Sequence, residues 1–480
     1  MSSALAGQLG MATPLYDLLG SSNAEMEAEF SDYANLGVKW VRTDFWWNLA
    51  QPTKNGGYDW TIFDKVVSMA AKYGIEVVAE LNGYPSNWVD GTFSSKASQT
   101  AFGAFAAAAA AHFGDKVDHW EIFNEQNMAG ISPENYSAIL KLAYTAIKAV
   151  DASDLVITGG LASAPSTTKG VYGAVDYLKA MYASGAEGYF DAVGYHPYSY
   201  PYLPSASDSW NGWQMMEDGI RSTMIANGDA DLPIWITELG APTAGSATAA
   251  VTEATQSTTL IQATLLAGQY DWAGPIMWYS YKDKGTSSTD IESWFGMIRP
   301  DGSHKSLYDT YETLAHALNA KNADATFSVA SFTGTTASET IVGNAKDNKI
   351  WAGYGDDVVS GGAGNDVIIG QWGNDTLIGG DGNDRFVFND AKLMGNDFVM
   401  DFRDGDKIDL RNIDADTNAA GDQSFKFLGS AWLSKAGDLG AYADPHGWTS
   451  ITGDINGDGA GDFVIRVAGN HTFVASDFLV

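Results

Sequence analysis

Residues 116–127 read K-V-D-H-W-E-I-F-N-E-Q-N. The stretch begins polar, becomes apolar at Trp120, Ile122 and Phe123, and ends in the polar group N-E-Q-N. A buried parallel strand has this pattern where it emerges at the rim of a barrel, because its middle is covered and its end meets solvent. A carboxylate at such an end, flanked by amides, suits acid/base chemistry. The stretch therefore predicts a catalytic carboxylate at Glu125, which needs a partner elsewhere.

Strand-like and helix-like segments alternate over residues 10–320. Apolar bursts occupy 38–44, 75–81, 117–124, 155–160, 190–196, 233–238 and 274–280, with a weaker one near 9–14. Amphipathic stretches lie between them, at 23–36, 60–73, 97–113, 133–150, 251–270 and 306–318. The alternation predicts a (β/α)8 barrel, with a doubly wound sheet as the alternative. The barrel is favoured because polar and aromatic residues follow several different strands, not one switch point.

The composition excludes several classes of protein. A net charge of −32 over 480 residues argues against nucleic acid and anionic membranes as partners. The absence of cysteine excludes a thiol nucleophile, a zinc-thiolate site and disulfides. No apolar run reaches the roughly 18 residues of a membrane helix, so no membrane insertion is expected. The first basic residue is Lys39, so either the chain has no classical signal peptide or one has been trimmed.

A period of nine residues begins after Asn322. Five repeats read GNAKDNKIW (343–351), AGYGDDVVS (352–360), GGAGNDVII (361–369), GQWGNDTLI (370–378) and GGDGNDRFV (379–387). This is the G-G-x-G-x-D-x-U-x pattern of a calcium-binding parallel β-roll, in which the apolar residue at position eight packs inside. The carboxylates would repel each other without Ca²⁺, so the roll is expected to order when the metal binds. The predicted metal-site residues are Asp357, Asp366, Asp375, Asp384, Gly355, Gly364, Gly373 and Gly382.

A second acidic segment, D-I-N-G-D-G-A-G-D-F, occupies residues 454–463. Its spacing suits another calcium loop, although the helices of an EF-hand are missing. A plain hairpin with Asn-Gly and Asp-Gly turns is an equal alternative. The candidate ligands are Asp454, Asn456, Asp458 and Asp462.

The whole C-terminal region resembles the RTX domain of type I-secreted proteins such as the serralysin-like proteases. The chain end, Asp477-Phe478-Leu479-Val480, resembles the terminal acidic-then-hydrophobic signal of such exports. The resemblance implies several bound Ca²⁺ ions, a type I secretion machinery as partner, and an extracellular location outside a Gram-negative bacterium. We expect a catalytic barrel over residues 1–322, and an all-β RTX and secretion-signal domain over 323–480.

A second carboxylate follows another apolar strand. Residues 231–240 read D-L-P-I-W-I-T-E-L-G and place Glu238 after Ile234-Trp235-Ile236. If Glu125 ends strand four, Glu238 ends strand seven, and both side chains face the same barrel mouth. Two carboxylates across that mouth are the minimal machinery of glycoside hydrolysis.

The barrel sequence resembles glycoside hydrolase clan A, and most nearly family 39. The resemblance is carried by W-E-I-F-N-E-Q-N, G-Y-H-P-Y (194–198), I-T-E-L-G, M-W-Y-S-Y (277–281) and W-F-G-M-I-R-P-D-G-S-H-K (294–305). It implies that Glu125 is the acid/base, Glu238 the nucleophile of a retaining reaction without a catalytic cofactor, and Asn124 a ligand of the sugar 2-hydroxyl. Gln126 stands where the clan usually has proline.

Further residues at predicted strand ends complete the candidate site. The clan commonly has an arginine at the position of Arg42 that hydrogen-bonds the nucleophile. His196 follows strand six, and Tyr198 or Tyr195 is expected to orient Glu238. Glu80 is the rival carboxylate, interpreted as a subsite or structural residue. The expected sugar-contacting aromatics are Trp278 as platform and Trp46, Trp47, Trp88 and Tyr281 on the rim.

These patterns predict a secreted retaining β-glycosidase that acts inside polysaccharide chains or on oligosaccharides. An exo-β-xylosidase is the alternative within enzymes. A calcium-dependent matrix protein whose barrel only binds glycan is the alternative from another class.

Overall fold

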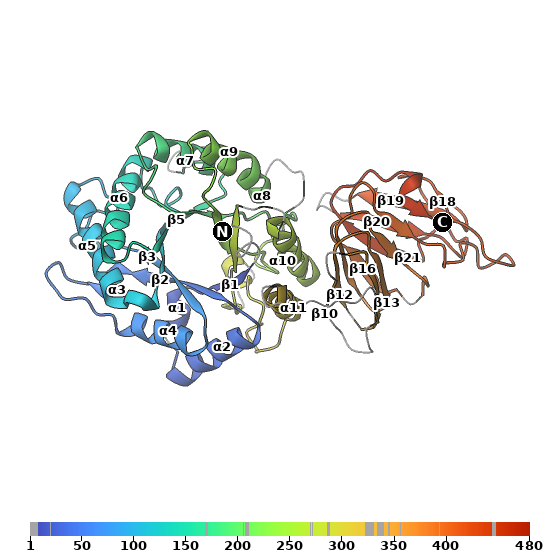
Figure 1. Cartoon of the computed structure of the whole chain (residues 1–480), viewed down its shortest axis with the longest axis horizontal. Helices are drawn as coiled ribbons and strands as arrows, with labels where there is room; N and C mark the ends of the chain where they lie inside the picture. Colours follow the sequence, from blue (N-terminus) through green and yellow to red (C-terminus); the bar gives the residue numbers. More distant parts are fainter. Residues whose placement is uncertain are drawn as a thin grey trace. The chain divides into compact units, whose positions relative to one another are not determined.

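The computed structural model describes residues 8–19, 21–168, 171–204, 206, 211–268, 270, 272–285, 289–321, 331–333, 340–343, 346–355, 357–392, 394–443 and 448–480. Two compact units make up the chain (Figure 1). The first is Met1–Pro204 with Asp208–Asn319, and the second is Ser205–Ser207 with Ala320–Val480. The boundary expected at residue 322 lies just outside the described residues.

The first unit is a closed barrel of eight parallel strands in chain order. Each predicted apolar burst, including the weak first one, contains one strand. The strands are β1 (Leu9–Ala12), β2 (Trp40–Trp46), β3 (Glu76–Asn82), β4 (His119–Asn124), β5 (Leu155–Ala162), β6 (Val193–His196), β7 (Ile234–Leu239) and β8 (Ala273–Trp278). The predicted (β/α)8 barrel is therefore confirmed, and all strands point their carboxyl ends to one rim.

Helices surround the barrel (Figure 1). The six predicted helical stretches correspond to α2 (Asn23–Asn35), α4 (Thr61–Lys72), α5 (Lys96–Phe113), α6 (Pro133–Val150), α10 (Glu253–Gly268) and α11 (Ser306–Lys321). Ser132 caps α6 by accepting the Asn135 amide at 3.3 Å, with Pro133 in the first turn. The sequence did not predict α1 (Leu15–Leu19), α3 (Trp47–Ala50), α7 (Ala174–Ala183), α8 (Gly212–Met215) and α9 (Ser222–Ala226).

The second unit consists of two β-sheets. One has the order β10-β12-β14-β16-β21-β20-β19-β18, and the other β22-β17-β15-β13-β11-β9. Successive nonapeptides place their strands in alternate sheets, so residues 18 apart pair in parallel, as Ile350 pairs with Ile368. The strands are β9 (Ser331–Thr333), β10 (Thr340–Val342), β11 (Lys349–Tyr354), β12 (Val358–Ala363), β13 (Val367–Trp372), β14 (Thr376–Asp381), β15 (Arg385–Val387), β16 (Asn396–Val399), β17 (Lys407–Asp409), β18 (Lys426–Phe427), β19 (Asp438–Ala443), β20 (Trp448–Gly453), β21 (Phe463–Ala468) and β22 (Phe478–Leu479).

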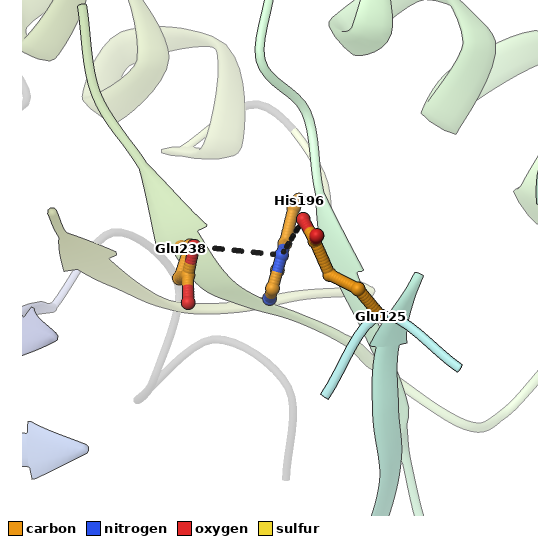
Figure 2. Close-up of side chains that lie close together, drawn as sticks. All are labelled: Glu125, His196 and Glu238. Atoms are coloured by element: carbon orange, nitrogen blue, oxygen red, sulfur yellow. Dashed lines mark hydrogen bonds and ion pairs between the residues drawn. The ribbon is translucent and has the colours of Figure 1, made fainter. Parts of the chain in front are cut away.

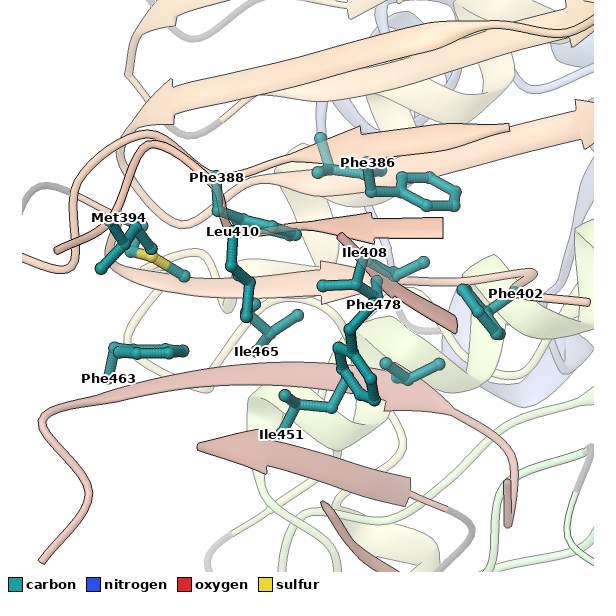
Figure 3. Packing of buried hydrophobic residues seen from close by; sticks show 14 of the residues in the cluster. Phe386, Phe388, Met394, Phe402, Ile408, Leu410, Ile451, Phe463, Ile465 and Phe478 are labelled. Atoms are coloured by element: carbon teal, nitrogen blue, oxygen red, sulfur yellow. The ribbon is translucent and has the colours of Figure 1, made fainter. Parts of the chain in front are cut away.

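One apolar core runs through this second unit (Figure 3). The position-eight residues of the repeats are buried in it, namely Ile350, Val359, Ile368, Leu377 and Phe386. Phe478 of β22 joins the same core, so the expected secretion signal forms an edge strand here. The alternation of buried apolar residues and glycine-rich turns confirms the predicted β-roll. Among the residues that the structure describes, no helix is both long and apolar enough to span a bilayer.

Candidate active site

Glu125 and Glu238 come together at the carboxyl-end rim of the barrel. Glu125 directly follows β4, and Glu238 is the next-to-last residue of β7. A carboxylate oxygen of each and a ring nitrogen of His196 lie within 4.8 Å of one another (Figure 2). Positive φ angles at Phe123 (71°) and Glu125 (43°) turn the backbone sharply where β4 ends. The paired carboxylates predicted from the two strand ends therefore occupy one site.

The Arg42 guanidinium, on β2, links the polar side chains around this pair. Its Nη1 donates to Glu238 Oε1 at 2.7 Å, and its Nε donates to Glu121 Oε2 at 2.5 Å. Its Nη2 contacts Asn124 Oδ1 at 2.9 Å and Glu80 Oε2 at 2.7 Å. Because Arg42 is only 4% exposed, these contacts are largely shielded from water. The arginine thus lies against the predicted nucleophile, as the resemblance implied.

His196 and Tyr198 hold the two carboxylates from β6 and its following turn. His196 Nδ1 lies 3.1 Å from Glu125 Oε1 and 3.6 Å from Glu238 Oε2, while its Nε2 lies 3.1 Å from Thr237 Oγ1. The Tyr198 hydroxyl donates to Glu238 Oε2 at 2.8 Å. Tyr195 instead donates to the Gly212 carbonyl, so Tyr198 is the tyrosine that orients Glu238. His196 is fully buried and positions both carboxylates from beneath.

The electrostatic surroundings of the carboxylates differ. Burial acts to raise the pKa of Glu238, but the electrostatic interactions with His196 and Arg42 and the Tyr198 hydrogen bond outweigh it and lower that pKa. Burial raises the pKa of Glu80 well above its usual value, although Arg42 opposes the change. The surroundings thus favour the ionised form of Glu238 and the protonated form of Glu80. The Glu125 side chain is 34% exposed, against 13% for Glu238.

The carboxylates open into a pocket of about 620 Å³. Glu80, Asn124 and Arg42 are its polar lining, and the six aromatic side chains in its wall are Tyr16, Trp46, Tyr198, Tyr200, Tyr279 and Phe295. The Tyr16 and Trp46 rings stack 6.2 Å apart. Aromatic faces next to paired carboxylates suit the C–H faces of sugar rings.

Of the five aromatic residues predicted as platform or rim, Trp46 lines the pocket and the other four lie elsewhere. Trp278 is fully buried and is not in the pocket wall; its neighbour Tyr279 is, so the platform prediction was wrong. Trp47 is also fully buried, packed edge-on against Trp88 and stacked on Phe105. Tyr281 donates to Asp32 of α2 at 2.6 Å. None of Trp47, Trp88 or Tyr281 lines the pocket, because their side chains pack among helices outside it.

Gln126, which stands where the clan usually has proline, has a structural role. It is fully buried, and its Nε2 donates to the Gly159 carbonyl of β5 at 2.9 Å. The Glu125 amide donates to the adjacent Gly160 carbonyl at 3.0 Å. These bonds tie the turn after β4 to β5, and so fix the turn that proline shapes in the clan.

Glu125, His196 and Glu238 are close enough to hold a metal ion. Both oxygens of Glu238, however, already accept hydrogen bonds, one from Arg42 and one from Tyr198. A cation there would displace these donors and oppose the guanidinium charge. The arrangement therefore favours carboxylate chemistry over metal ligation.

The aspartates of the β-roll fit calcium. Asp366 Oδ1 accepts the Asn348 amide at 2.7 Å, and Asp384 Oδ1 accepts the Asp366 amide at 2.8 Å. Their Oδ2 atoms are buried and have no hydrogen-bond partner among the described residues. Burial raises the pKa of Asp366 to about 6 and that of Asp384 to about 7. Buried carboxylate oxygens without donors are the ligands that Ca²⁺ prefers.

Glycine makes room for these oxygens. A Cβ on Gly361 would lie 2.2 Å from Asp366 Oδ2, and one on Gly379 would lie 2.3 Å from Asp384 Oδ2. The other aspartates predicted as ligands, Asp357 and Asp375, are also buried. Position four of the last four repeats has positive φ, at Gly355, Gly364, Gly373 and Gly382. Asp357, Asp366, Asp375 and Asp384, with the carbonyls of these turns, would hold the ions.

The loop at residues 454–462 is closed by its own hydrogen bonds. Asp454 accepts the amides of Asn456, Gly457 and Gly459 at 3.2, 2.6 and 2.8 Å. Asp462 accepts the Ile455 amide at 2.7 Å and the Asn456 side-chain amide at 2.6 Å. Asp458 lies at the exposed tip, between β20 and β21. This is an antiparallel hairpin connection, and a calcium site in it stays a prediction.

Family models match both units. The model described as cellulase (glycosyl hydrolase family 5) matches residues 7–278. The model described as RTX calcium-binding nonapeptide repeat matches residues 333–368 and 352–386, so the chain carries calcium-binding repeats. The clan and the RTX repeats recognised in the sequence are thereby confirmed. None of the curated proteins compared with the chain matches it.

Solved structures share the barrel fold. A family 39 glycoside hydrolase from Bacteroides cellulosilyticus is 20% identical, with a TM-score of 0.54 over 66% of this chain and 65% of that one. The chain thus spans slightly less than two thirds of that relative. A GH5_18 protein from Streptomyces cattleya, solved with GlcNAc, is 16% identical, with a TM-score of 0.50 over 72% of this chain and 85% of that one.

Proposed function

Since the chain belongs to the cellulase family, glycosyl hydrolase family 5, we propose that it is a retaining β-glycosidase with Glu238 as nucleophile and Glu125 as acid/base. The observation that carries the proposal is the spacing of the two carboxylates, within 4.8 Å at their nearest ligand atoms. Retaining enzymes separate their carboxyl groups by about 5–5.5 Å, whereas inverting enzymes leave room for water at about 6.5–9.5 Å.

The contacts of each carboxylate support its role. Glu238 is held ionised by Arg42 and Tyr198, as an attacking carboxylate must be. Glu125 contacts His196 and, in the described part of the chain, no arginine or lysine. Its greater exposure lets protons reach it from solvent.

The reaction follows from this division. Glu238 attacks the anomeric carbon while Glu125 gives its proton to the leaving glycosidic oxygen, which forms a covalent glycosyl-enzyme. Glu125, now ionised, then takes a proton from the water that attacks this intermediate, and the sugar leaves with its original configuration. Asn124 Oδ1 is held by Arg42, which leaves its Nδ2 to donate to the sugar 2-hydroxyl.

We also propose a polysaccharide substrate cut within the chain. A 620 Å³ pocket with aromatic side chains from several loops exceeds the space of one pyranose ring. The RTX repeats support export through a type I machinery and action outside the cell, where calcium is available to the roll.

The test is replacement of each carboxylate. Glu238→Gln and Glu125→Gln should each lower kcat/KM on a chromogenic glycoside by at least about 10³-fold, because each removes a group used in every turnover. Glu312→Gln, at an exposed position of α11, is the matched control. Full activity in either glutamine variant would refute the assignment.

Azide distinguishes the two roles. With Glu238→Ala it should yield a glycosyl azide of inverted configuration, and with Glu125→Ala one of retained configuration. Product profiles on oligosaccharides test the rest: monosaccharide alone from the start would indicate an exo-β-xylosidase. Binding without any hydrolysis would indicate a glycan-binding matrix protein.

A further inference from the structure

The outward face of the six-stranded sheet carries an unusual set of side chains. Along β11, β13, β15 and β17, Ile350, Ile368, Phe386 and Ile408 point into the core. Because side chains alternate along a strand, their neighbours face outward. One outward row is Lys349, Val367, Arg385 and Lys407, and the next is Trp351, Ile369, Val387 and Asp409.

This face holds a second pocket, of about 510 Å³. Its floor is apolar and includes Trp351, Ile369 and Val387, while Asn389 and Asn412 lie in its wall. The Asn412 side-chain amide donates to Asn389 Oδ1 at 2.7 Å. The pocket therefore offers an aromatic surface and amide groups side by side.

Three cations and one carboxylate surround that floor, which leaves an excess of two positive charges. Arg411 binds Asp409 through two bonds, from Nε at 2.9 Å and from Nη2 at 2.7 Å. Arg385 Nε lies 3.6 Å from Asp409 and is buried without a hydrogen-bond partner in the described residues. Lys349 Nζ is held 4.3 Å above the Trp351 ring. A local excess of positive charge in a chain of net charge −32 favours an anionic ligand.

We propose that this face of the β-roll binds an acidic polysaccharide, through the carboxylates of its uronic acid residues. A uronate ring presents an apolar C–H face for Trp351, hydroxyls for the two asparagines, and a carboxylate for Arg385 and Lys349. This site is separate from the catalytic pocket and would keep the enzyme on an anionic glycan.

The experiment uses the full chain with Glu238→Gln, saturated with calcium, so that nothing is hydrolysed. Titration calorimetry measures its binding to a hyaluronan hexasaccharide and to the same oligosaccharide with its carboxyl groups reduced. We expect binding of the charged form at least tenfold tighter than that of the neutral form. We expect Lys349→Gln with Arg385→Gln to abolish this preference, and Trp351→Ala to weaken binding of both forms.

Lys426→Gln, an exposed lysine on the other sheet, is the matched control and should leave binding unchanged. Lys349→Gln alone, at an exposed position, tests the site without touching the Arg385–Asp409 contact. Equal affinity of the parent protein for the two oligosaccharides would overturn the proposal. So would unchanged affinity in the Lys349, Arg385 and Trp351 variants. So would binding of phosphatidylglycerol vesicles, but not of the hexasaccharide, by the same residues.

Discussion

The barrel and the β-roll both bury carboxylates, but they neutralise them differently. In the barrel, one buried guanidinium, that of Arg42, contacts Glu80, Glu121 and Glu238. In the roll, no basic side chain in the described residues pairs with Asp366 or Asp384, whose Oδ2 atoms are left without donors.

Because of this difference, the charge state of Glu238 depends on the protein itself, whereas the aspartates of the roll depend on a bound cation. A built-in counter-charge helps to lower the pKa of Glu238, the proposed nucleophile, and so favours its ionised form whatever the surroundings contain. A roll without such a charge has carboxyl pKa values raised to about 6 and about 7, and so depends on an external cation. Stability of the roll is thus coupled to calcium, whereas the catalytic site is not.

Removal of calcium should produce the largest effect. A chelator is expected to unfold residues ~340–470 while the barrel stays folded, because metal binding contributes directly to folding free energy. At 100 times the dissociation constant, each ion contributes about 2.7 kcal/mol. Circular dichroism should show loss of the β signal, and the chromogenic assay should show retained activity. An unchanged spectrum after chelation would show that folding of the roll does not depend on calcium.

Arg42→Met should come next. It leaves the buried side chains of Glu80, Glu121 and Glu238 without their shared partner, at a cost of about 3–5 kcal/mol of barrel stability. The barrel transition should therefore move to lower temperature in calorimetry, while the calcium-dependent transition of the roll stays in place. An equal decrease in the temperatures of both transitions would show that the effect of Arg42 is not confined to the barrel.

The stability of the calcium-free roll should depend on pH, with a smaller effect than that of Arg42→Met. Its direction should be opposite to that of a carboxylate whose pKa is lowered on folding. Burial raises the folded pKa of Asp384 to about 7 from 3.8, so the folded state binds protons that the unfolded state has released. Stability is therefore greatest below about pH 4 and falls as the pH rises to about 7. With chelator present, the β signal of the roll in circular dichroism should be larger at pH 5 than at pH 8. Calcium should remove the difference.

Glu80→Gln should have the smallest effect. Burial raises the pKa of Glu80 and so favours its neutral form, which an amide of the same shape imitates, so the stability change should stay within about 1 kcal/mol. Activity should stay within about tenfold of wild type, in contrast to Glu238→Gln. A loss as large as that of Glu238→Gln would show that Glu80 is ionised and would add a second charge to the reaction.

The strands and repeats could be predicted because burial controls them over several residues. Eight apolar runs became eight strands, and the aspartates recur at a fixed spacing. The catalytic pair could be predicted because both glutamates end such runs. The apolar runs and the repeat spacing can be recognised even when a predicted strand boundary is wrong by a residue.

Apart from Trp46, the platform and rim aromatics of the pocket could not be predicted, because a shift of one residue reverses the direction of a side chain. Trp278 ends β8 and points into packing, whereas Tyr279, one residue later, lines the pocket. Trp47 begins α3, so Trp46, not Trp47, faces the site. The shared use of Arg42 by three glutamates also needs the closed barrel, since those residues lie on four strands.

The ladder of aspartates in the roll has a consequence for how the protein can change length. Asp366, Asp375 and Asp384 each accept the amide of the residue 18 positions earlier, as Asp384 does from Asp366. One 18-residue coil thus contacts only its neighbours, so a coil can be added or lost without changing the register of the rest. The barrel has no such freedom, because losing one strand would open the ring. Variation in size among related chains should accumulate in the roll, in steps of 18 residues.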